Sequence, residues 1–235
     1  MALLMGCDIG SSSVKVSVID EQGRFLFSAS SPDRELPIHA PEPGFAEQDP
    51  ESWWDHLKNA VRKLKAGSDI DLREVRAVGI TYQMHGLVCV DREKKVLRPA
   101  IIWCDSRAVK TGAAAAERIG REACLRTLLN LPGNFTASRL AWVKENEPDI
   151  FRRVHRIMLP GDYIAMKMTG DIRTTVAGLT EGIFWDFQER CLSDAVLEEY
   201  GFSSEIFPET VPVFSVQGRL LSGPASDLGL KTGTP

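Results

Sequence analysis

The alternation of apolar and polar positions near the amino terminus predicts two strands joined by a polar turn. An apolar run at residues 3–5 leads into Cys7-Asp8-Ile9-Gly10 and three serines, and residues 14–19 then place valine at every second position. A β-branched side chain at every second position is typical of a strand and not of a helix. Residues 24–30 alternate in the same way after a turn, so we expect an antiparallel meander of three strands at the start of the chain.

Later segments predict strands that alternate with helices, which is the pattern of the α/β class. Five prolines between residues 32 and 50 predict an extended connection without regular structure. Asp49-Pro50-Glu51 has the residues of a helix start, and apolar residues from Trp53 to Leu64 recur on one helical face. Further strands are expected at residues 75–80, 87–90, 99–103, 154–159 and 216–220, and further helices at 107–119, 121–129, 137–145, 160–168 and 193–201.

Composition and charge narrow the class of protein. Of the 235 residues, 43% are apolar and 26% are charged, which is typical of a globular protein with one large domain or two small ones. The net charge of −4 provides no basic surface, so we expect no nucleic-acid partner. We also expect no membrane contact, because no apolar run has the length of a membrane span. Five widely spaced cysteines, without a C-x-x-C pair, predict reduced thiols in a cytoplasmic protein.

The turn at residues 10–13 has the chemistry of a phosphate site. Gly10 permits unusual backbone angles, and Ser11, Ser12 and Ser13 offer N–H groups and hydroxyls that can surround phosphate oxygens. Asp8, at the end of the first strand, can hold Mg²⁺ through water or orient a nucleophile. The glycine spacing fits neither a Walker A loop nor a Rossmann fingerprint. An ordinary hairpin with a polar turn is the alternative that this stretch leaves open.

Two further stretches carry groups that suit a sugar. Met84 and His85 follow a predicted strand, and ligands of α/β sheets gather at the carboxyl ends of strands. His85 can donate to a sugar hydroxyl and Met84 can form an adaptable apolar wall, although a loop histidine can also be merely solvated. Trp103 can pack against the C–H face of a sugar, while Asp105 and Arg107 can either grip hydroxyls or form a structural ion pair.

A third stretch lies before the helix expected at residue 137. Thr136 is predicted to cap this helix through its hydroxyl. Asn134 has two interpretations that the sequence does not separate, because its amide can cap the same helix or reach a substrate hydroxyl.

Five motifs together resemble the amino-terminal half of the FGGY carbohydrate kinases, and the Gln-Met-His-Gly version is most similar to the xylulokinase branch. The motifs occur in the family's order, and they are Asp8-x-Gly10-Ser11-Ser12-Ser13-x-Lys15, residues 43–50, residues 83–86, residues 99–107 and residues 159–163. The resemblance implies a ribonuclease H-like (actin-like ATPase) fold, with a mixed sheet that starts with the three-strand meander and is flanked by helices. It also implies transfer of the γ-phosphoryl group of ATP to a ketopentose hydroxyl, with D-xylulose as the expected substrate.

The resemblance also assigns roles to residues. Met84 and His85 are expected to contact the sugar, joined by Trp103, Asp105 and Asn134 from the chemistry above. Gly10, Ser11, Ser12, Ser13 and Lys15 match the phosphate-binding segment, although a solvated strand lysine is the alternative for Lys15. Asp8 is the expected catalytic residue, and it is expected to hold Mg²⁺ through water.

The resemblance covers the whole chain and implies that residues 1–235 are a sugar-binding amino-terminal domain. Family members carry a second, nucleotide-binding domain, and their general-base aspartate lies in a G-x-x-D segment that is expected beyond Pro235. We therefore expect little turnover from this chain alone. The expected partners are a small sugar and ATP, and homodimer formation stays open. The alternatives are a non-catalytic sugar-binding or regulatory module, a kinase of ribulose, glycerol or gluconate, and an actin- or Hsp70-like ATPase.

Overall fold

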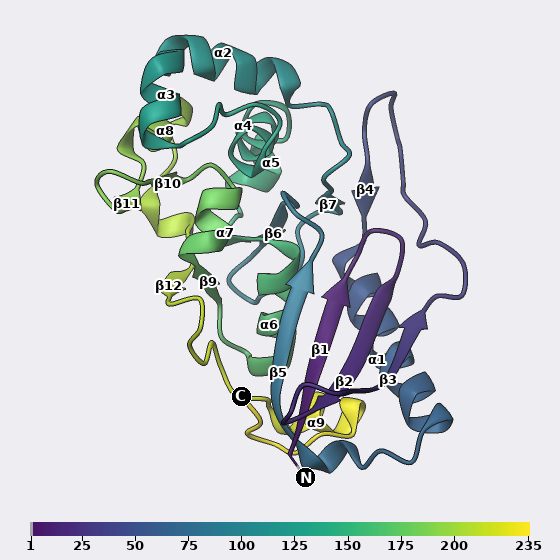
Figure 1. Ribbon diagram of the computed structural model, residues 1–235. Helices are drawn as coiled ribbons and strands as arrows, with labels where there is room; N and C mark the ends of the chain where they lie inside the picture. Colours follow the sequence, from purple (N-terminus) through teal and green to yellow (C-terminus); the bar gives the residue numbers. More distant parts are fainter. Residues whose placement is uncertain (1) are drawn as a thin grey trace.

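The computed structural model describes residues 2–235 and contains a four-stranded sheet in the order β3-β2-β1-β5 (Figure 1). The strands β1 (Leu3–Ile9), β2 (Val14–Asp20) and β3 (Phe25–Ser31) form an antiparallel meander, and β5 (Val75–Tyr82) pairs with β1 in parallel. The predicted meander and the mixed α/β sheet are thus confirmed.

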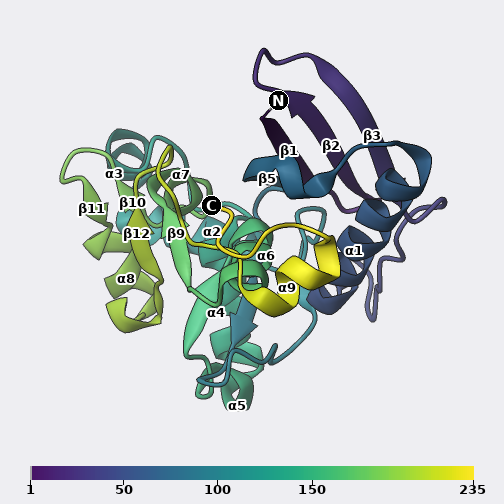
Figure 2. The same cartoon turned by 90° about the horizontal axis from the view of Figure 1, so that it is seen from below.

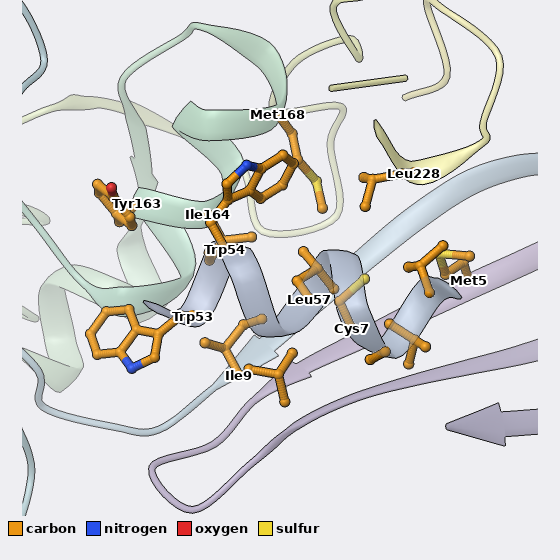
Figure 3. Packing of buried hydrophobic residues seen from close by; sticks show 14 of the residues in the cluster. Met5, Cys7, Ile9, Trp53, Trp54, Leu57, Tyr163, Ile164, Met168 and Leu228 are labelled. Carbon is orange, nitrogen blue, oxygen red and sulfur yellow. The ribbon is translucent and has the colours of Figure 1, made fainter. Parts of the chain in front are cut away.

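One face of this sheet is covered by helices and the other is exposed. Buried and exposed residues alternate strictly along β1, because successive side chains of a strand point to opposite faces. The helix α1 (Pro50–Gly67) packs its apolar stripe on the buried face, with Trp53 and Leu57 fully buried (Figure 3). Figure 2 shows α1 and α9 (Ser222–Leu228) on the same side of the sheet.

The start of α1 confirms the expected helix signal. The Asp49 carboxylate accepts a hydrogen bond from the Glu51 N–H at 3.0 Å, and Pro50 occupies the first helical position, where a missing N–H costs nothing. Because α1 contacts three strands and α6 (Pro160–Thr169) at once, it holds the meander against the rest of the molecule.

The other elements include α4, α7 and α8, which surround a second apolar core beside the sheet, and α6, which packs into the first core with α1 (Figure 1). Their bounds, in chain order, are β4 (Glu47–Gln48), β6 (Val88–Val90), β7 (Ala100–Ile101), α2 (Val109–Ile119), α3 (Arg121–Thr127), α4 (Thr136–Asn146), α5 (Pro148–Phe151), β8 (Arg156–Met158), α6 (Pro160–Thr169), β9 (Arg173–Thr175), α7 (Val176–Glu181), β10 (Trp185–Asp186), β11 (Cys191–Leu192), α8 (Asp194–Tyr200) and β12 (Glu209–Val211), with single 3-10 turns at Leu72–Glu74 and Ser204–Ile206.

Three predictions about local structure are wrong. Residues 216–220 form no strand, and the strand in this region is β12, which pairs in parallel with β9. The proline-rich connection contains a short strand, β4, which pairs with β7. Thr136 does not cap α4, because the helix begins at Thr136 itself with Phe135 in the capping position, and the Thr136 hydroxyl is buried without a partner among the described residues.

No helix within residues 2–235 is both long and apolar enough to span a membrane.

Candidate functional site

The carboxyl ends of β1 and β5 lie side by side, because the two strands are parallel and in register. The Gln83 N–H donates to the Ile9 carbonyl at 2.8 Å, which joins the loop after β5 to the end of β1. Asp8 is opposite Thr81 on β5 and opposite Lys15 on β2, so these three residues form a row on the exposed face of the sheet. The structure thus brings the loop with Met84 and His85 next to the hairpin turn (Figure 1).

The hairpin turn is closed tightly around Gly10. The Gly10 N–H donates to the Ser13 carbonyl at 3.0 Å, and a Cβ at Gly10 would lie 2.8 Å from the same oxygen, so a larger residue would open the turn. The N–H groups of Ser11, Ser12 and Ser13 donate no hydrogen bond to any other described residue. A turn with several free N–H groups is suited to bind an anion such as a phosphate group.

Trp103 links this turn to the predicted sugar residues. Its indole N–H donates to the Ser11 hydroxyl at 3.1 Å, and about half of its side chain is exposed (51%). The Gln48 amide reinforces the link, because it donates to the Ser11 carbonyl at 2.7 Å and accepts from Gln83 at 3.2 Å. We call residues 10–13, Met84, His85 and Trp103 the site surface, since these contacts place them at one end of the sheet.

His85 and Met84 differ in how firmly they are held. Met84 is 57% exposed, as an adaptable apolar wall would be. His85 is half-buried and has a left-handed backbone with φ of 60°. Its N–H donates to the Glu181 carboxylate, and its Nδ1 lies 3.1 Å from the Glu181 carbonyl oxygen. Burial and the nearby Arg139 guanidinium lower the pKa of His85, so the ring is neutral near pH 7.

Arg139 is a site residue that sequence reasoning missed. Its side chain is only 1% exposed, and its guanidinium donates to the carbonyls of His85, Trp103 and Asp105. Burial lowers its pKa to about 10. The sequence carried one signal, since an arginine stands among the apolar residues of the helix expected at 137–145, where a charge is buried only if it is paired.

Asp105 and Arg107 form a buried ion pair below the site surface. Asp105 is fully buried, and its carboxylate accepts from the Ala46 N–H at 2.6 Å and from Arg107 Nε at 2.9 Å. The Arg107 side chain also contacts Glu47 at 2.8 Å and stacks on Phe45 with 3.7 Å to the ring centroid. Both partners are already engaged, so this placement favours the structural ion pair over direct contact with a ligand.

Asn134 does not cap α4. Its amide group donates to the Asp105 carbonyl, and its Oδ1 is buried without a hydrogen-bond partner among the described residues. An unpartnered buried oxygen is costly, and a bound donor would satisfy it.

Asp8 offers a single exposed carboxylate to a metal ion. No group of three or more His, Cys, Asp or Glu side chains that could hold a metal gathers within residues 2–235. A single carboxylate nevertheless fits Mg²⁺, which keeps several waters and is bound by one or two carboxylates together with substrate phosphates. The residues present therefore fit a magnesium ion that is held with a nucleotide, not a dedicated protein cage.

Two acidic side chains, Asp162 and Glu181, lie behind the site surface. Asp162, at the start of α6, is buried, and burial raises its pKa to about 7. Burial also raises the pKa of Glu181, while the hydrogen bond from the His85 N–H opposes this rise. The ring of Tyr82 lies between β5 and α6, where a Cβ on Gly161 would come within 2.0 Å of it. These groups form the support of the loop that carries His85.

A cavity of about 650 Å³ lies elsewhere, along the outer edge of β5. It is lined by Val78, Met168, Phe214 and Pro235 among others, and it contains none of the predicted site residues. The Val78 N–H donates to the Pro235 carbonyl at 2.9 Å at this edge. Tyr82, Gly161 and Asp162 also line this cavity, so it borders the support of the His85 loop without including a predicted site residue.

Comparison with known proteins gives consistent matches over the whole chain. Residues 3–235 match the FGGY family of carbohydrate kinases, N-terminal domain. A xylulose kinase of Escherichia coli (strain K12) is 34% identical over 230 residues, which are 98% of this chain and 46% of that protein. A xylulose kinase of Bacillus subtilis (strain 168) is 29% identical over 98% of this chain and 46% of its own length.

The solved structure of a xylulose kinase from Rhodospirillum rubrum superposes with a TM-score of 0.89 at 26% identity, covering 99% of this chain and 47% of that chain. The chain thus spans about half the length of the curated relatives it matches.

Proposed function

Because the chain belongs to the FGGY family of carbohydrate kinases, we propose that residues 1–235 are the sugar-binding amino-terminal domain of an ATP-dependent sugar kinase. The proposed reaction transfers the γ-phosphoryl group of ATP to a hydroxyl of a ketopentose, and converts D-xylulose to D-xylulose 5-phosphate. The similarity to several xylulose kinases supports this substrate over ribulose, glycerol or gluconate. The fold, an actin-like ATPase fold, is shared with solved sugar kinases.

The hydrogen bond between Trp103 and Ser11 is the observation that carries the proposal. It joins the turn with free N–H groups to the exposed indole, and the Gln48 contacts join the same turn to the loop of Met84 and His85. A phosphoryl donor and a sugar must meet at one place, since phosphoryl transfer depends chiefly on positioning and electrostatic stabilisation. The site surface provides both kinds of group at one end of the sheet.

In the proposed mechanism each residue has one task. The N–H groups of residues 11–13 and the Lys15 ammonium bind phosphate oxygens, and Asp8 holds Mg²⁺ through water. ATP supplies the phosphoryl group, and Mg²⁺ neutralises its charge when bound. Trp103 packs on the sugar ring or chain, Met84 forms the apolar wall, and His85 hydrogen-bonds a hydroxyl. We assign the general base and most of the nucleotide site to a second domain, so residues 1–235 alone are proposed to be catalytically incomplete.

Tryptophan fluorescence during a titration with D-xylulose tests the sugar site. We expect a saturable change that Trp103→Phe abolishes, because Trp103 is the exposed indole of the site surface. The matched control is Trp185→Phe, which removes a tryptophan of the second core and should leave the change intact. With ATP and Mg²⁺ added, we expect no measurable phosphorylation of the sugar by residues 1–235.

Several outcomes would contradict the proposal. A titration signal that survives in Trp103→Phe would place the sugar elsewhere. Tighter saturable binding of ribulose, glycerol or gluconate would change the substrate, and no binding of any sugar would leave only an ATPase or a different ligand class. Phosphorylation of D-xylulose at an ordinary kinase rate would refute the assignment of the base to a second domain.

A further inference from the structure

His85 adopts a backbone conformation that needs support from its surroundings. Its φ of 60° lies in the left-handed region, which few residues other than glycine adopt and which costs free energy at a non-glycine position. Such a conformation persists only where neighbouring groups hold it. Two side chains from different helices hold this one, Glu181 at the end of α7 and Arg139 in α4.

Glu181 contacts His85 twice. Its carboxylate accepts the His85 backbone N–H, and its carbonyl oxygen lies 3.1 Å from Nδ1 of the imidazole. A carbonyl oxygen can only accept, so Nδ1 must carry the ring proton in this contact. A neutral imidazole that is protonated at Nδ1 has its lone pair at Nε2. Nε2 makes no hydrogen bond to any residue in the described part of the chain.

Arg139 and Phe135 fix the other sides of His85. The Arg139 guanidinium donates to the His85 carbonyl, and the Phe135 ring packs edge-on against the imidazole with centroids 4.5 Å apart. The helices that supply these groups are themselves connected, since the Ala137 N–H of α4 donates to the Gly182 carbonyl after α7 at 3.0 Å. The imidazole is therefore held by a frame that spans α4, α7 and the loop after β5.

We propose that Glu181 and Arg139 are positioning residues that hold His85 as the Nδ1–H tautomer, so that its Nε2 accepts a hydrogen bond from a sugar hydroxyl. The sequence alone suggested that His85 donates to the sugar, and the Glu181 carbonyl reverses this role for the neutral ring. The tautomer is inferred from contacts within the protein alone. The identification of a sugar hydroxyl as the group that donates to Nε2 rests on the proposed function. Glu181 thereby determines which kind of ligand group His85 can recognise.

The charge state of the ring agrees with this role. Burial and the Arg139 guanidinium lower the pKa of His85, and the contact with Glu181 opposes them. Arg139 from α4 is the charged group that acts on the imidazole, whereas Glu181 from α7 contacts the ring through its backbone carbonyl. The ring is therefore neutral near pH 7, where only a neutral ring has an acceptor nitrogen.

The test is the long-range ¹H–¹⁵N spectrum of His85 in the ligand-free chain, with its signals assigned by His85→Gln. We expect a protonated, pyrrole-type Nδ1 and an unprotonated, pyridine-type Nε2 at pH 7.5. Addition of D-xylulose should move the Nε2 signal and leave Nδ1 protonated. Glu181→Ala keeps the backbone carbonyl but removes the carboxylate that accepts the His85 N–H, so the imidazole is no longer held beside that carbonyl. In this variant we expect a mixture of tautomers and about tenfold weaker binding of D-xylulose, the effect of losing about one hydrogen bond.

Two further variants separate positioning from folding. Glu181→Gln keeps an acceptor for the His85 N–H, so it should retain the tautomer and bind D-xylulose within about twofold of the original chain. Glu189→Ala removes an exposed acid farther along the same segment and should change neither readout. A pyridine-type Nδ1 in the ligand-free chain would overturn the inference whatever the sugar result. A correct tautomer without any response to sugars would instead overturn the proposed function.

Discussion

Asp162 gives a prediction about how stability depends on pH. Its carboxylate is buried behind the site surface, accepts the Leu159 N–H at 3.3 Å, and has a pKa raised by burial from 3.8 to about 7. In the unfolded chain this carboxyl ionises near its ordinary value. Between about pH 4 and pH 7 the folded protein therefore binds more protons than the unfolded chain, so this group makes the free energy of unfolding fall as pH rises.

The size of the effect follows from the two pKa values. A difference of about 3 corresponds to a loss of about 4 kcal/mol of unfolding free energy, which is almost absent at about pH 4 and complete by about pH 8. In Asp162→Asn the amide oxygen can still accept the Leu159 N–H, but no charge forms. We expect this variant to approach the original chain near pH 4 and to be more stable by up to about 4 kcal/mol at pH 8.

Urea denaturation of both proteins at each pH between 4 and 8 measures this difference directly. Titrating groups that do not interact with Asp162 cancel in the difference, whereas the Glu181 carboxylate contributes to it because its charge helps to raise the pKa of Asp162. The control is Asp69→Asn, which makes the same substitution at an exposed carboxyl and should not reproduce the stabilisation at pH 8. A flat difference for Asp162→Asn would show that this carboxyl titrates normally and would refute the reasoning.

Two further predictions test the packing at Gly112 and the exposure of the cysteine thiols. A Cβ at Gly112 would lie 1.6 Å from the Gly133 carbonyl oxygen, so Gly112→Ala should lower the free energy of unfolding by more than about 2 kcal/mol, although alanine is the better helix former. The control is Ala113→Gly on the exposed side of the same helix, which should lower the free energy of unfolding by about 1 kcal/mol in the same urea experiment. An unchanged free energy of unfolding in Gly112→Ala would contradict the close contact with Gly133. Of the five cysteines, Cys104 and Cys191 are exposed, so an aromatic disulfide reagent should modify two thiols rapidly in the folded protein and all five in denaturant. A third rapid thiol would contradict the burial of the remaining cysteines.

The strands and helices with a strong local pattern were predictable from the sequence. The valines at 14, 16 and 18 alternate with the period of a strand, and all three are buried in the structure. The start of α1 carries its own capping residue in Asp49. The prediction of a strand at residues 216–220 is wrong because an apolar pattern alone does not provide a partner strand. This segment instead makes single hydrogen bonds, such as that from the Leu220 N–H to the Thr234 carbonyl.

The candidate site was predictable only in part. Residues 10–13, Met84, His85 and Trp103 became candidates because each stretch carries a chemical signature beside a strand. The structure brings them to one end of the sheet, and their binding roles stay predictions. Arg139 was missed because its role depends on three carbonyls that are distant in sequence. Thr136 was assigned as a cap from its residue type, yet the helix begins one residue earlier than expected, so Thr136 is its first residue and Phe135 its N-cap.

The buried ion pairs below Trp103 have a consequence for how the site responds to salt. Asp105, Arg107 and Glu47 are shielded from solvent, and added ions screen buried charges far less than exposed ones. The serine turn and Lys15 face the solvent, so their attraction for an anion weakens as ionic strength rises. The buried ion pairs under the indole therefore keep their arrangement in concentrated salt, while the proposed phosphate contacts of the turn lose strength. Ionic strength therefore acts more strongly on the serine turn and Lys15 than on the buried ion pairs under Trp103.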